Sequence, residues 1–168
     1  MGNHGWQEAG ASAPVTDARG REAGLERAET TALLRRLGDV AGEHVLILGR
    51  DVDLMCGLIR RGCAEVTELD QNHRPDTGSA DLIVVVDVRS DAAAVCAVSH
   101  ARRALAPAGR IAVHAAANPS AYLTRSIMRA LRLHGFRQIG FGPIGAGTIV
   151  TAERPMGALA GVKSAGRG

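Results

Sequence analysis

Three polar side chains, Asp70, Asp87 and His114, each close a short run of residues that is typical of a strand. The run 64–69 alternates between apolar and polar residues, as in a strand near an edge, whereas the runs before Asp87 and His114 are mostly apolar. Runs of this kind are typical of strands in a parallel sheet that is covered on both faces. The carboxyl ends of such strands meet at one edge, where open α/β sheets bind their ligands. A carboxylate or an imidazole at that edge can take a proton from a substrate, so Asp87 and His114 are candidate catalytic residues. The alternative for Asp87 is a solvated acid in a strand-to-helix turn.

A fourth run, His44 to Leu48, is closed by Gly49, and two acids, Asp51 and Asp53, follow within the same turn. A glycine after a strand lets the backbone approach a ligand closely and adopt dihedral angles that side chains forbid. Gly49 therefore ends this strand at the edge where a ligand would lie, with Asp51 and Asp53 beside it.

These residues must be positioned by elements that alternate between helix and strand along the chain. Apolar spacing, capping residues and Gly or Pro stops mark their limits. The last two strands are joined by a glycine-rich connection too short for a helix, so they should pair antiparallel. We expect helices over 25–37, 50–61, 90–106 and 118–134, the last capped by Asn118, and strands over 44–48, 64–69, 81–87, 110–114, 136–141 and 148–153.

The chain has 168 residues, of which 46% are apolar, a length and composition typical of one globular domain. Residues 1–24 and 155–168 are rich in Gly and Ala without apolar periodicity, and we expect both to be disordered. The folded domain should therefore occupy residues 25–154.

Several classes of protein are excluded or disfavoured by composition. No apolar run is long enough to cross a membrane and no secretory signal precedes the domain, which predicts a cytoplasmic protein without a membrane role. The net charge of +3 and the 2% aromatic content are low for a nucleic-acid partner. Neither the three cysteines nor the histidines show the spacing of metal ligands, so no metal site is predicted.

Four blocks in order resemble the class I S-adenosylmethionine-dependent methyltransferases over about residues 25–154. They are the strand and turn Val45 to Gly49, the strand that ends in Asp70, the segment Asp76 to Val84, and the stretch from Ala101 through Pro107-Ala108-Gly109 to Val113. His134-Gly135-Phe136 and the final strand extend the likeness. The resemblance implies a three-layer Rossmann-like fold with a mostly parallel sheet of about six strands and a C-terminal antiparallel hairpin. It also implies S-adenosylmethionine as cofactor, with Asp70 accepting hydrogen bonds from the ribose.

The chain departs from that family at the cofactor site. Of the family's Gly-x-Gly-x-Gly turn only Gly49 remains, because Asp51 and Asp53 stand at the other glycine positions. Ile47 replaces the acid that family members often carry in the first strand, and Asp51 or Asp53 would have to substitute for it. The short connection from Asp70 to Asp81 has no room for the family's usual third strand and its helices, so we expect that strand to be missing.

Two functional hypotheses of different classes follow, and a third is weaker. The leading one is a methyltransferase-like domain that is non-catalytic or strongly altered and acts as a binding, regulatory or assembly subunit, with a protein partner or as a homo-oligomer. The alternative is an active S-adenosylmethionine-dependent methyltransferase on a small molecule or a protein. A nicotinamide-dependent oxidoreductase is disfavoured because Gly49 lacks the Gly-x-Gly-x-x-Gly continuation.

Overall fold

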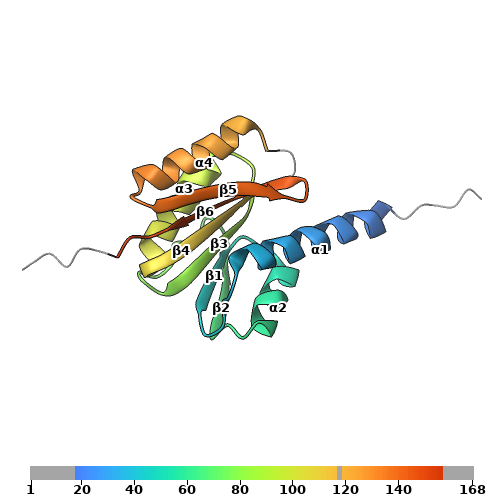
Figure 1. Cartoon of the computed structure of the whole chain (residues 1–168), viewed down its shortest axis with the longest axis horizontal. Helices are drawn as coiled ribbons and strands as arrows, with labels where there is room; N and C mark the ends of the chain where they lie inside the picture. The colour runs from blue at the N-terminus through green and yellow to red at the C-terminus, as the bar shows by residue number, and fades with distance from the viewer. Residues whose placement is uncertain (1–17, 117–118, 157–168) are drawn as a thin grey trace, which may run out of the picture.

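A computed structural model describes residues 18–116 and 119–156, and only the backbone of residues 18–26 (Figure 1). The described residues form four helices and a six-stranded sheet. In chain order the elements are α1 (Ala18–Leu37), β1 (His44–Leu48), α2 (Val52–Arg60), β2 (Glu65–Leu69), β3 (Ala80–Val88), α3 (Asp91–Ala104), β4 (Leu105–Ala115), α4 (Ala121–Leu133), β5 (Arg137–Ile144) and β6 (Gly147–Glu153).

The sheet has the strand order β2-β1-β3-β4-β6-β5. Strands β2, β1, β3 and β4 are parallel to one another, whereas β6 is antiparallel to both β4 and β5. The carboxyl ends of β1, β3 and β4 therefore lie together at one edge. This arrangement confirms the predicted mostly parallel sheet with an antiparallel C-terminal hairpin.

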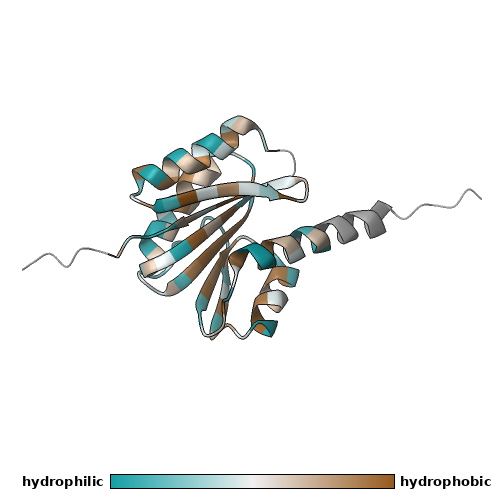
Figure 2. Ribbon diagram, in the orientation of Figure 1, coloured by the Kyte–Doolittle hydropathy of each residue, from teal (hydrophilic) through white to brown (hydrophobic). Residues whose placement is uncertain are grey.

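Two hydrophobic cores sandwich the sheet between helix layers. One core joins α3 and α4 to alternate residues of the central strands, such as Leu46 and Leu48 of β1. The other joins α1 and α2 to the intervening residues, including Val45 and Ile47 of the same strand. Figure 2 shows the hydrophobic stretches along the central strands, which fits strands covered on both faces.

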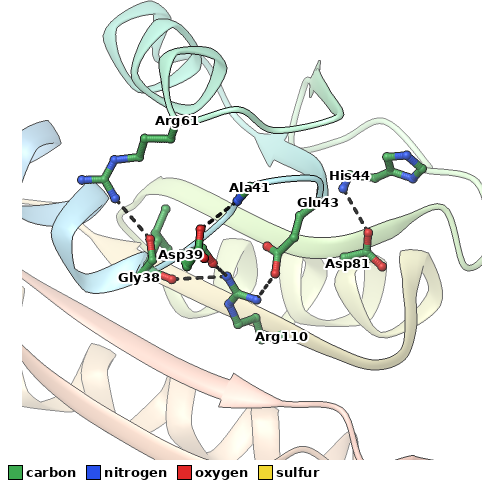
Figure 3. Close-up of polar contacts among 9 residues, drawn as sticks. Gly38, Asp39, Ala41, Glu43, His44, Arg61, Asp81 and Arg110 are labelled. Atoms are coloured by element: carbon green, nitrogen blue, oxygen red, sulfur yellow. Dashed lines mark hydrogen bonds and ion pairs between the residues drawn. The ribbon is translucent and has the colours of Figure 1, made fainter.

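The amino-terminal edge of the sheet is fastened by polar side chains (Figure 3). Arg110 of β4 donates to the Glu43 carboxylate and to the backbone oxygens of Leu37 and Asp39, which ties the end of α1 to the sheet. Asp81 accepts a hydrogen bond of 3.0 Å from the His44 backbone N–H, linking the starts of β1 and β3. These contacts leave the opposite, carboxyl edge available for a site.

The connection from Asp70 to β3 contains turns but no helix or strand. Strand β2 is consequently at the edge of the sheet. The predicted loss of the third strand is confirmed, since nothing in this connection adds a strand beyond β2.

Some predicted boundaries differ from the structure. Helix α1 begins at Ala18, so it extends into the segment 1–24 that was expected to be disordered; residues 1–17 and 157–168 lie outside the described part. Helix α4 is capped by Ser120, whose hydroxyl accepts from the Leu123 N–H at 3.1 Å, and so begins later than predicted. Asn118, the predicted cap, lies outside the described residues.

Candidate functional site

The carboxyl edge of the sheet holds two neighbouring cavities. The larger has a volume of about 1230 Å³ and lies between α1, the turn after β1, the ends of β3 and β4, and the start of α4. The smaller, of about 320 Å³, lies over the ends of β1 and β2. Both are lined by Arg50, Val86 and Asp87. Ligand sites of open α/β sheets lie in this position, outside the carboxyl ends of the strands.

Asp70 follows β2 and lines the smaller cavity, where it is exposed. Its carboxylate accepts a hydrogen bond of 2.9 Å from the Asn72 N–H, and its carbonyl accepts one of 2.8 Å from the His73 N–H. The turn therefore holds the acid in place. Asp70 retains a carboxylate oxygen with no hydrogen bond among the described residues.

Gln71 lies across the end of β1, between the strands on either side of it. Its side-chain Nε2 donates to the Val86 carbonyl of β3 at 2.6 Å. A Cβ added to Gly49 would lie 2.6 Å from the Val86 Cγ2 and 3.4 Å from Gln71 Nε2. Gly49 also has a φ of +116°, which disfavours any side chain. The protein's own packing thus accounts for this glycine.

Asp51 is the N-cap of α2. Its Oδ1 accepts a hydrogen bond of 2.8 Å from the Leu54 N–H. Asp53 lies in the first turn of the helix and is exposed. Both acids line the larger cavity, whereas Gly49 and Asp70 line only the smaller one. The predicted cofactor-binding residues are therefore divided between two cavities.

Asp87 lines both cavities and has a strained backbone, with a φ of +58°. Its Oδ1 accepts a hydrogen bond of 2.8 Å from Arg89 Nε, and both side chains are more than half exposed. The register between β3 and β4 shifts next to it, between Val85 and Val88. This irregularity turns the Asp87 backbone at the edge where the ligand crevice begins.

His114 is half-buried in the wall of the larger cavity. Its Nε2 is buried without a hydrogen-bond partner and lies 2.7 Å from where a Cβ of Gly147 would stand. Burial lowers the pKa of the imidazole below its ordinary value, and the negative charges of Glu29, Asp87 and Asp51 counter this shift only in part. His114 is therefore neutral at pH 7.

Two residues of the site, Glu29 and Gln71, were not among the site residues predicted from the sequence. Glu29 reaches from α1 to the turn between β5 and β6, where its Oε1 accepts from the Ala146 N–H at 2.9 Å. It closes one side of the larger cavity. No local pattern marks this contact, because the partners are 117 residues apart. Gln71 carried one weak signal, its place directly after the strand-ending Asp70.

The solved structures that this chain resembles include S-adenosylmethionine-dependent methyltransferases. An O-methyltransferase from Thermotoga maritima matches with a TM-score of 0.60 and 13% identity, covering 76% of this chain and 64% of that enzyme. A second match is geranyl diphosphate C-methyltransferase from Streptomyces coelicolor A3(2), solved with Mg²⁺, geranyl diphosphate and S-adenosylhomocysteine. Its TM-score is 0.61 and its identity 13%, and the match covers 88% of this chain and 89% of that enzyme. A geranyl diphosphate methyltransferase solved with S-adenosylmethionine matches with a TM-score of 0.60 and 13% identity. This match covers 85% of this chain and 93% of that enzyme.

The chain therefore has the class I methyltransferase fold, as the sequence resemblance predicted. It spans less than two thirds of the Thermotoga enzyme's length but nearly all of the geranyl diphosphate enzymes. No protein-family model and no curated protein sequence matches the chain. Among the described helices none is long and apolar enough to cross a membrane, and no three His, Cys, Asp or Glu side chains of the described residues group as metal ligands.

Proposed function

We propose that this chain is a methyltransferase-like domain that does not transfer methyl groups and serves as a binding, regulatory or assembly subunit. The observation that carries this proposal is the hydrogen bond from Gln71 to the Val86 carbonyl, which crosses the end of β1 beside Gly49. In the methyltransferases that the sequence resembles, the cofactor's methionine part passes close to the backbone of this turn. Here the Gln71 side chain lies beside this turn and lines the smaller cavity next to Gly49, where it would compete with the cofactor for space.

Two further features of the same turn support the proposal. Ile47 stands where family members often carry an acid, and it is fully buried in the core under α1 and α2. Asp51 uses one carboxylate oxygen to cap α2. The family has a glycine at this position, with no side chain beside the backbone. Here the position carries the Asp51 side chain, whose carboxylate caps α2. Steric and charge terms both oppose the family's usual cofactor pose.

Calorimetric titration with S-adenosylmethionine and S-adenosylhomocysteine tests the proposal. We expect the wild type to give no heat of binding even when the concentration of the added cofactor is well above the micromolar range. Asp70→Ala is the site variant, and Asp76→Ala, an exposed acid in the same connection, is its matched control. Micromolar binding that Asp70→Ala abolishes and Asp76→Ala preserves would show a working cofactor site and remove the observation that carries the proposal. Methyl transfer by the wild type that is lost in Asp70→Ala would overturn it.

We also propose that the domain works with a protein partner or as a homo-oligomer. Support comes from the missing third strand, which leaves β2 at the edge of the sheet. Light scattering coupled to size-exclusion chromatography measures the molar mass over a range of protein concentrations. A mass above that of one chain supports the homo-oligomer, whereas a strict monomer removes that form of the proposal.

One observation favours the alternative of an active methyltransferase. Asp87 and the neutral imidazole of His114 both line the larger cavity, and they are the residues that could take the proton that an acceptor loses. In that case S-adenosylmethionine would supply the methyl group from the side of Gly49 and Asp70. Transfer of radiolabelled methyl groups to a small molecule or a protein, lost in Asp70→Ala and reduced in His114→Gln, would support this alternative.

A further inference from the structure

The larger cavity has an uneven charge. Five carboxylates line it. They come from α1, from the start of α2, from β3 and from the start of α3: Glu29, Asp51, Asp53, Asp87 and Asp91. They come from segments far apart in the sequence and face one space. The cavity is thus surrounded by acids on several sides, which distinguishes it from a single acidic turn.

Among the residues that the structure describes, two basic side chains, Arg50 and Arg89, line the same cavity. The lining therefore carries an excess of three negative charges. Arg89 is already engaged, because its Nε donates to Asp87. His114 adds no positive charge at pH 7, since burial keeps its imidazole neutral.

Apolar side chains also border the cavity, and Tyr122 is an exposed one among them. Leu33 of α1, Val86 and Val88 of β3 and Leu123 of α4 line it, and each of these side chains is buried in the adjoining cores. Tyr122 lies at the rim and is 68% exposed. An aromatic face near a cation adds a favourable electrostatic contact. The lining suits a ligand with an apolar body and a positive end.

A metal-bridged anion is the other ligand that carboxylates can bind. Within the described residues, however, no three acidic, histidine or cysteine side chains are grouped closely enough to hold a metal ion. Two of the acids are also engaged with the protein, Glu29 with the Ala146 N–H and Asp51 with the Leu54 N–H. The acids are spread around the cavity.

We infer that the larger cavity binds an organic cation, an amine with an apolar or aromatic body. This inference rests on the proposed function, in which the cavity is the working ligand site of a domain without methyl transfer. It names the ligand class of that site. A positive ligand gains from the excess of carboxylates, while an anion of the same size is repelled.

Three probes of one ring system and different charge test the inference: tryptamine, the neutral tryptophol and indole-3-acetate. Binding is followed by ¹⁵N NMR shifts of the wild-type protein without S-adenosylmethionine. We expect tryptamine to bind at least about tenfold more tightly than indole-3-acetate, a difference of about 1.4 kcal/mol. Raising the salt from 20 to 300 mM should weaken tryptamine and leave tryptophol unchanged.

Two variants locate the effect. Glu29→Gln keeps an oxygen that can accept from Ala146, and Asp53→Asn changes an exposed side chain, so each removes charge with little disturbance of the fold. Each should weaken tryptamine about threefold. Glu153→Gln is the matched control, because Glu153 lies at the opposite end of the sheet, paired with Arg110 in the β4–β6 register.

The outcomes separate this inference from the proposed function. Equal or tighter binding of indole-3-acetate, binding of indole-3-acetate only with added Mg²⁺, or binding of none of the three probes would overturn the organic-cation assignment. An equal loss in Glu153→Gln would also overturn it, since the effect would then come from net charge alone. Methyl transfer that is lost in Asp70→Ala, measured separately, would overturn the proposed function without deciding which charge the larger cavity prefers.

Discussion

Replacing Gln71 by alanine should lower the free energy of unfolding, because it removes the hydrogen bond that closes the end of β1. Gln71 Nε2 lies 2.6 Å from the Val86 carbonyl and is partly buried. A net intramolecular hydrogen bond contributes about 1 kcal/mol, and an acceptor left without a partner costs about 1–3 kcal/mol when water cannot reach it. The site borders a cavity, so water can reach the carbonyl and the lower end of that range applies. We expect a loss of about 1–2 kcal/mol.

Urea unfolding followed by circular dichroism measures this loss. With a slope of about 2 kcal/mol/M, the midpoint of the Gln71→Ala variant should fall by roughly 0.5–1 M at unchanged slope. Asn72→Ala is the matched control, since Asn72 is an exposed amide residue of the same turn. Gln71→Glu should destabilise more than alanine at pH 7, because a carboxylate would face the Val86 carbonyl, and should recover at low pH, where the protonated acid can donate.

Two results would refute this reasoning. If Gln71→Ala and Gln71→Glu both unfold at the wild-type midpoint, the side chain does not hold the end of β1. If Asn72→Ala is as unstable as Gln71→Ala, the effect belongs to the turn as a whole. In either case the hydrogen bond from Gln71 to the Val86 carbonyl could no longer support the proposed lack of cofactor binding.

Three further predictions concern the site and its supports. Burial lowers the pKa of His114 in the folded state, so the unfolded chain binds the proton more readily. The free energy of unfolding should therefore fall as pH drops through about 6.5. Urea midpoints measured across this range should show a smaller fall in His114→Gln. Ile47→Asp, which puts the family's acid back, should cost about 3–5 kcal/mol by burying a charge without a partner, and a near-native melting temperature would contradict this. Ser120→Ala should cost about 1 kcal/mol by removing the cap of α4, whereas Ser120→Asp should keep native stability in the same thermal scan.

Much of the fold was predictable because the signals are local. The apolar runs of β1, β3 and β4 reflect strands covered on both faces, and Val45 and Leu46 pack into different cores, as the pleat of a strand requires. Ser90 caps α3 as predicted, with its hydroxyl accepting from the Ala93 N–H. The start of α4 was placed too early, because Asn118 and Ser120 are both good caps and only the observed hydrogen bond separates them.

The sequence by itself determined the strand and helix order, the loss of the third strand and the acid at the end of β2, since each depends on residue type and chain length within a short segment. The tertiary structure alone decided how the candidate residues are grouped. Strand β1 lies between β2 and β3, so Gln71 can reach Val86 across Gly49. Glu29 meets Ala146 only because α1 crosses to the hairpin of β5 and β6. Such contacts depend on sheet order and helix placement, which no short stretch of the sequence encodes.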